Sequence, residues 1–158
     1  MKTLVIYYTR TNFTKKIAEE LSVKLQTTIE EVIDLKNRRG ALGFVIAGKD
    51  AVQKNLTEIK LPDLNFADYD LVLVGTPVWA GTMAPAIRTI LTDKKSELKK
   101  VACFATQGGQ NLQKVFSEVE KLIDKKLVAS EFFVDKEIVQ KIYTDKMEKF
   151  VEQLKINN

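Results

Sequence analysis

The feature that most constrains the fold is an alternation of short apolar runs with longer segments whose apolar residues recur every three or four positions. The short runs are typical of strands and the longer segments of amphipathic helices. Residues 71–74 and 101–105 are apolar throughout, as is typical of strands buried on both faces of a parallel sheet. We expect five strands, over residues 3–8, 29–34, 71–76, 101–106 and 127–134.

Segments with the apolar periodicity of amphipathic helices lie between these strands or after them. Their apolar residues are Phe13, Ile17, Leu21 and Leu25; Ala84, Ile87 and Leu91 around Pro85; Leu112, Val115, Val119 and Leu122; and Ile142, Met147, Phe150, Val151 and Leu154. Because strand and helix alternate along the chain, the connections are crossovers and the sheet is parallel, with helices on both faces. We predict a single doubly wound α/β domain over residues 1–158, with no repeat or linker that divides it.

Composition excludes several kinds of chemistry. The chain has no histidine and one cysteine, so a histidine-based triad, a histidine metal site and an internal disulfide are all excluded. No apolar run approaches the roughly 18 residues of a membrane span. The first residues enter a strand without a cleavage site, so we expect a cytoplasmic protein. Its chemistry is then expected to come from a cofactor or from weaker side chains.

The positive charge is concentrated in one window. The net charge is +4, and residues 36–60 alone contain six Lys and Arg against two Asp and Glu. This window is either a docking surface for an acidic partner or anionic substrate, or a solvated loop and helix face. No nucleic-acid motif accompanies it, so we do not expect nucleic-acid binding.

Ligands of doubly wound sheets bind beyond the carboxyl ends of the strands, so the segments after the strands are the places to search. After the first strand come Thr9, Arg10, Thr11, Asn12, Phe13 and Thr14, which lead into a helix. Three hydroxyls at a helix N-terminus, together with its free N–H groups and dipole, favour a phosphate site. The alternative is that one or two of these residues only cap the helix.

Two further loops follow the third and fourth strands. The first contains Thr76, Pro77, Val78, Trp79, Ala80 and Gly81, and the second contains Thr106, Gln107, Gly108 and Gly109. Trp79 is the only tryptophan of the chain and offers a flat apolar face to a planar ligand. The paired glycines permit close backbone approach, either to a ligand or in a plain strand-to-helix turn.

Together the three loops resemble those of the flavodoxins and flavodoxin-like FMN proteins over essentially the whole chain. The resemblance implies a three-layer fold whose five-stranded parallel sheet has the order 2-1-3-4-5, and FMN as the cofactor. It implies that the loop of residues 9–14 holds the FMN phosphate through Thr9, Thr11 and Thr14. It also implies that Trp79 lies against the isoalloxazine and that residues 106–109 contact its pyrimidine side.

The chain departs from the family pattern at three points. Asn12-Phe13 replaces the Gly-Asn pair of the phosphate loop, where Asn12 is expected to adopt the left-handed conformation. Ala80 stands where many flavodoxins have a glycine whose peptide changes conformation on flavin reduction, and a positive φ at Ala80 costs roughly 1 kcal/mol. The chain is basic whereas well-studied flavodoxins are acidic, so we expect a less negative flavin potential.

The leading functional prediction is therefore an FMN-binding redox protein of the flavodoxin electron-transfer type, acting on a redox partner protein or a small, possibly anionic, electron acceptor. The alternatives are an NAD(P)H-dependent FMN quinone reductase and a flavin-free interaction module of the same fold. Residues 43–50 have the spacing of a nucleotide P-loop, but Asp50 replaces its Ser or Thr, so we expect a loop and short helix there. Cys103 is expected to be an inert core residue.

Overall fold

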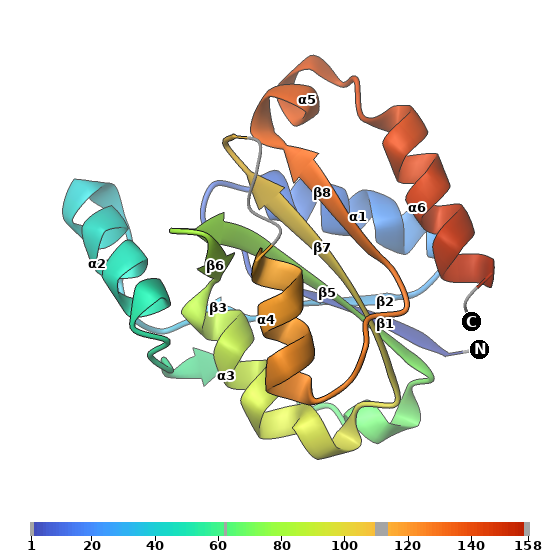
Figure 1. Ribbon diagram of the computed structural model, residues 1–158, viewed down its shortest axis with the longest axis horizontal. Coiled ribbons are helices and arrows are strands. Elements are labelled where there is room, and N and C mark those ends of the chain that lie inside the picture. The colour runs from blue at the N-terminus through green and yellow to red at the C-terminus, as the bar shows by residue number, and fades with distance from the viewer. Residues whose placement is uncertain (1, 62, 110–113, 157–158) are drawn as a thin grey trace.

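Five parallel strands form the centre of the computed structural model, which describes residues 2–61, 63–109 and 114–156 (Figure 1). Their spatial order is β2-β1-β5-β7-β8, so the predicted order of the five strands is confirmed. The strands are β1 (Thr3–Tyr7), β2 (Thr28–Glu31), β5 (Leu71–Trp79), β7 (Lys100–Gln107) and β8 (Ser130–Val134). The three middle strands are almost wholly apolar and buried, because helices cover both of their faces.

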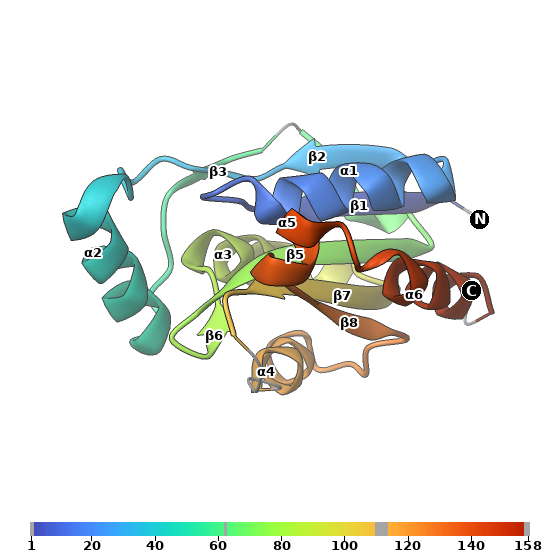
Figure 2. The ribbon, with the colours of Figure 1, turned by 90° about the horizontal axis from the view of Figure 1, so that it is seen from above.

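The helices form two layers, one on each face of the sheet (Figures 1 and 2). On one face α1 (Phe13–Leu25) and α6 (Thr144–Ile156) pack against Val5, Leu73 and Phe104. On the other face α3 (Pro85–Lys94) and α4 (Lys114–Ile123) pack against Ile6, Val74 and Cys103. The fully buried Cys103 is thus a core residue, as predicted, and burial raises the pKa of its thiol.

One segment lies outside the two helical layers. The two-stranded pair of β3 (Ile33–Asp34) and β4 (Ile59–Lys60) brackets α2 (Gly40–Val52). In both views α2 stands at the end of the molecule to which the arrowheads of the sheet point. It therefore lies at the edge of the sheet where ligands of this architecture bind. The remaining short elements are η1 (Phe66–Asp68), η2 (Lys95–Glu97) and α5 (Asp135–Gln140).

Several predicted boundaries were wrong. The expected strand 29–34 is divided between β2 and β3, and the expected strand 127–134 begins only at Ser130. Ile142 was expected inside the last helix, but it precedes α6 and is 66% exposed. The helical stripe that includes Leu112 can be followed only from α4 onward, because residues 110–113 lie outside the described residues.

The largest difference concerns residues 75–82, which were expected to form a loop. Instead β5 continues to Trp79 and turns back into β6 (Thr82–Met83), with Val78 paired to Met83 and Trp79 to Thr82. The tryptophan is therefore held at the tip of a hairpin. Among the described residues, no helix is both long and apolar enough to cross a membrane.

Candidate functional site

The three loops singled out in the sequence leave the sheet at the same edge. Their parent strands β1, β5 and β7 are adjacent and parallel, with Tyr7 in register with Gly75 and Pro77 in register with Thr106. Residues 9–14, 76–81 and 106–109 are therefore neighbours in space, although nearly a hundred positions separate the first from the last. The first and third loops are in direct contact, because the hydroxyls of Thr14 and Thr106 are hydrogen-bonded at 2.7 Å.

The first loop leads into α1, whose N-terminus has neither a side-chain cap nor an acidic residue in its first turn. Asn12 has φ 66°, the left-handed conformation expected for it, and its side chain does not cap α1. The first turn contains no acidic residue, and instead Lys15 and Lys16 lie beside the positive end of the helix dipole. Lys15 lies 3.7 Å from Glu31, and Lys16 donates to the Ile138 carbonyl at 3.3 Å. The free N–H groups, the dipole and the positive charge of the two lysines together favour an anion at this helix start. No motif in the sequence indicated that these lysines lie beside the site.

The three hydroxyls of this loop differ in their surroundings. The Thr9 Oγ1 atom is buried without a hydrogen-bond partner in the described part of the chain. Thr14 is buried and bonded to Thr106, while Thr11 is exposed. A buried hydroxyl without a partner costs free energy, so Thr9 is the position where a ligand oxygen would be most effective.

The third loop has a similar unsatisfied group. The Gln107 Oε1 atom is buried and has no partner among the described residues, and Gly108 and Gly109 are exposed beside it. A Cβ on Gly108 would lie 3.7 Å from the carboxylate of Asp135, at the start of α5. Burial raises the pKa of Asp135. No motif in the sequence indicated that Asp135 lies beside this loop.

The second loop is the β5–β6 hairpin. The Thr76 hydroxyl is buried and accepts a hydrogen bond from the Ala84 N–H at 3.1 Å, which ties the strand to the start of α3. Pro77, Val78 and Trp79 are half-buried. Ala80 and Gly81 form the turn, with φ 48° and 86°. Positive φ at both positions is typical of a two-residue hairpin turn and is unfavourable for alanine.

This geometry gives a prediction for the turn. Replacing Ala80 with glycine is expected to raise the free energy of unfolding by about 0.5–1 kcal/mol, because glycine adopts positive φ without a Cβ clash. Urea denaturation of the two proteins measures the difference. The control is Gly81→Ala, which introduces the same strain at the next position and should lower stability. An unchanged or lower stability of Ala80→Gly would contradict the conformation described for Ala80.

Two side chains outside the predicted loops hold Trp79. The ring of Tyr8 meets the indole edge to face, with the ring centroids 5.5 Å apart. The Arg38 guanidinium carbon lies 5.7 Å from the centroid of the indole. Contacts of this kind stabilise an aromatic ring in one orientation. The tryptophan is therefore positioned by the residue that follows β1 and by the segment after β3, and neither contact is indicated by local sequence patterns.

Arg38 is the centre of a buried ion-pair network. It is 4% exposed, and its Nε and Nη1 donate to Asp34 at 2.5 Å and Asp50 at 2.7 Å. Lys36 also donates to Asp50, at 2.7 Å. Burial raises the pKa of Asp50, but hydrogen bonds from Lys36, Arg38 and Asn55 outweigh it and lower this pKa to about 2. The network joins the segment after β3 to α2.

Further contacts connect this network to the loop of residues 9–14. The Arg10 guanidinium donates to the backbone carbonyls of Arg38 at 3.0 Å and Gly40 at 3.2 Å, and it lies 5.3 Å from the ring of Phe44. A Cβ on Gly43 would clash with the backbone of Arg38, so α2 can pack this closely against Arg38 only with glycine at position 43. Arg10, which was predicted as a ligand-binding residue, thus also anchors α2.

The basic window is not the uniformly solvated face that one alternative assumed. Arg38 is buried in the network, Lys36 is paired with Asp50, and Lys54 lies 3.7 Å from Glu118. Arg39 and Lys49 are exposed and make no ion pair with the described residues. Much of the local positive charge is therefore balanced within the fold. In the part of the chain that the structure describes, no group of acidic, cysteine or histidine side chains could hold a metal ion.

Comparison with known proteins gives consistent results. The model of the family described as Flavodoxin matches residues 2–154. A crystal structure of a flavoprotein in complex with FMN, from Lactobacillus acidophilus NCFM, is 31% identical to this chain and has a TM-score of 0.75. The match covers 88% of this chain and 97% of that one. No curated protein matches the sequence.

A more distant match concerns the fold alone. The solution structure of two-electron reduced Megasphaera elsdenii flavodoxin is 16% identical and has a TM-score of 0.56. That match covers 84% of this chain and 85% of the flavodoxin.

Proposed function

The chain belongs to the flavodoxin family, and on that premise we propose that it is an electron carrier whose redox group is FMN. FMN is the cofactor that the family and the FMN complex of the Lactobacillus relative support. The proposal adds that the protein exchanges electrons with a redox partner protein or a small, possibly anionic, acceptor. The carrier role and the cytoplasmic location expected from the sequence are predictions.

The strongest support for the cofactor site is the buried Thr9 hydroxyl, which has no partner among the described residues and lies beside the uncapped start of α1. A phosphate ester offers several charged acceptor oxygens, which would accept hydrogen bonds from Thr9 and from the first N–H groups of α1. Lys15 and Lys16 would add positive charge around it. The donors of this loop and the phosphate of FMN therefore match in chemistry.

The other two loops suit the ring system. Trp79 would provide a flat apolar surface, which Tyr8 and Arg38 hold in place. The unpartnered Gln107 Oε1 is an acceptor and would take a ring N–H, while Gly108 and Gly109 leave room for close approach. When bound, FMN supplies reversible electron transfer, and the chain binds it, orients it and adjusts its electrostatic surroundings.

A kinetic experiment separates a carrier from a reductase. We expect that mixing the FMN-loaded protein with NADPH leaves the flavin absorbance unchanged. The reason is that no strand of the chain is followed by the G-x-G-x-x-G turn that binds a dinucleotide pyrophosphate. Stopped-flow absorbance near the visible flavin band measures the reaction, and dithionite serves as the positive control. Rapid direct bleaching by NADPH would instead identify a reductase.

A further inference from the structure

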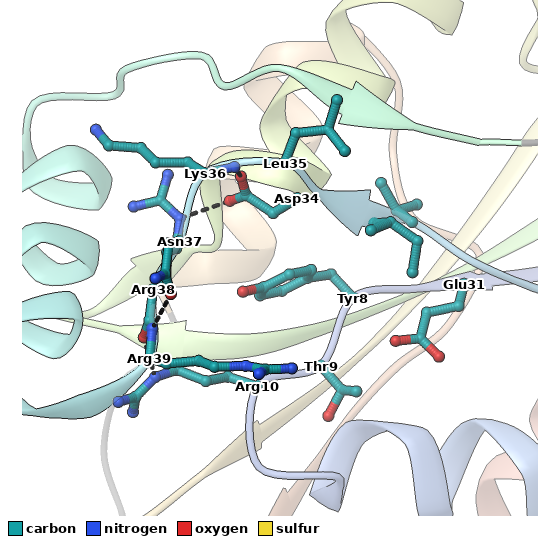
Figure 3. Close-up of a pocket in the computed structure, with 12 residues that line it drawn as sticks. Tyr8, Thr9, Arg10, Glu31, Asp34, Leu35, Lys36, Asn37, Arg38 and Arg39 are labelled. Carbon is teal, nitrogen blue, oxygen red and sulfur yellow. Dashed lines mark hydrogen bonds and ion pairs between the residues drawn. The ribbon is translucent and has the colours of Figure 1, made fainter.

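A cavity lies beside the proposed cofactor site. It has a volume of ≈ 460 Å³ and is formed by residues 8–10, which follow β1, and by residues 31–39 (Figure 3). Of the residues predicted to bind FMN, its described lining includes Thr9 and Arg10 but none from the hairpin or the third loop. This volume is in the range of small-molecule sites in proteins. The cavity therefore overlaps the proposed cofactor site at Thr9 and Arg10 and extends from there along residues 31–39.

The cavity presents hydrogen-bond donors that have no acceptor. In Figure 3 the Tyr8 hydroxyl points toward the segment that carries Asp34, Arg38 and Arg39, and it makes no hydrogen bond to the described residues. Burial and the nearby charge of Asp34 raise the pKa of Tyr8 to about 12, so it is a donor at neutral pH. The Nη2 atom of Arg38 is buried and unpartnered among the described residues.

Cations add to these donors. Arg39 lines the cavity, is exposed and makes no ion pair with the described residues. Arg10 also lines it, and the guanidinium is bonded to two backbone carbonyls, which leave its positive charge uncompensated. Arg10, Arg39, the buried Arg38 and Tyr8 thus line one cavity.

The carboxylates in the lining are already engaged. Asp34 accepts hydrogen bonds from the side chains of Arg38 and Thr57. Glu31 accepts one from the Tyr7 hydroxyl at 2.9 Å and lies 3.7 Å from Lys15. The groups that remain available are therefore donors and cations, which favour an anion. Ile33 and Leu35, which are 43% and 53% exposed, supply apolar surface at the cavity.

From this lining we propose that the cavity binds a small organic anion, with a carboxylate or phosphate group held by Tyr8, Arg38 and Arg39 and an apolar body against Ile33 and Leu35. The site goes beyond the proposed function, because it takes a second ligand in addition to FMN. Tyr8 connects the two sites, since its ring lines the cavity and meets Trp79. An anion in the cavity is therefore detected at Trp79.

The test uses the single tryptophan of the chain as the reporter. The FMN-loaded protein is labelled with 5-fluorotryptophan, which gives one ¹⁹F signal, and is titrated with benzoate, phenyl phosphate or the neutral benzamide. We expect saturable shifts with both anions and none with benzamide. Arg39→Gln should weaken anion binding about 10-fold, because it removes a positive charge and the guanidinium donors. Tyr8→Phe should weaken it about 5-fold, because it removes a hydroxyl donor. The control is Lys49→Gln, which removes an exposed cation outside the lining and should leave binding unchanged.

Several outcomes would overturn the proposal. They are equal binding of benzamide, no saturable shift with either anion, or anion binding that Arg39→Gln leaves unchanged. Displacement of FMN by the anions, seen in the visible spectrum, would place them in the cofactor site and also overturn it. If FMN itself fails to bind, the same titration of the FMN-free protein still tests the cavity through its dependence on Arg39. Failure of the proposed function and failure of this inference are then separate results.

Discussion

Replacing Arg38 with methionine is expected to lower the free energy of unfolding by about 3–5 kcal/mol, which is the usual effect of removing one partner from a buried ion pair. Asp34 and Asp50 would lose the guanidinium that lies 2.5 Å and 2.7 Å from them. Lys36 reaches Asp50 but is bonded to Asp34 only through its backbone N–H, so the charge of Asp34 would be left largely uncompensated. Urea denaturation measures the loss.

The matched control is Arg39→Met, the same substitution at the neighbouring, exposed position. It should change stability by less than about 0.5 kcal/mol, because surface substitutions away from a specific contact have small effects. Equal effects of the two variants would show that Arg38 is not the centre of a buried network.

Arg38→Met should also change the pH dependence of stability. The pKa of Asp50 is lowered to about 2 in the folded protein from its ordinary 3.8. A lowered folded-state pKa contributes stability that is complete above about pH 4 and is lost as the pH falls toward 2. Arg38→Met removes one of the hydrogen bonds that lower this pKa. Stability measured from pH 6 to pH 2 should therefore fall less steeply in the variant than in the parent protein.

The second large effect concerns the cofactor. Replacing Thr9 with valine is expected to weaken FMN binding about 10- to 100-fold, because one charge-assisted hydrogen bond to the phosphate is lost. Valine has nearly the same shape, and the Thr9 hydroxyl has no partner among the described residues, so the variant should fold normally. Titration of the FMN-free protein, followed by quenching of flavin fluorescence, measures the affinity.

Two controls distinguish a phosphate contact from general damage. Riboflavin lacks the phosphate, so its affinity should be the same for the parent protein and Thr9→Val. Thr92→Val makes the same substitution on α3, where the hydroxyl donates to the Arg88 carbonyl, and should leave FMN binding unchanged. If Thr9→Val weakens riboflavin and FMN equally, Thr9 does not contact the phosphate.

The sequence was sufficient to predict the fold and the edge at which the site lies. Alternating periodicities identified five strands, the resemblance to flavodoxins implied their order, and the positions after the strands identified the three loops. The left-handed conformation of Asn12 was also expected from its residue type. These features depend on neighbouring residues and on general rules of sheet topology, so a single chain contains enough information for them.

Other features depended on residues far apart along the chain. The extension of β5 to Trp79 depends on pairing with β6, which converts an expected loop into a hairpin. Ile142 fits the helical periodicity but lies where no element covers it. Short segments are decided by such tertiary contacts more than by their own residue pattern.

The sequence by itself therefore determined the order of the layers, the strands that carry the loops and the residue types within each loop, because side-chain periodicity is a local property of the chain. Only the tertiary structure decided that Arg38 is buried rather than solvated, and that Tyr8 and Arg38 hold Trp79. The physical reason is that the burial of a charge depends on the partners the fold brings to it. For Arg38 those partners are Asp34, Asp50 and the indole of a distant hairpin.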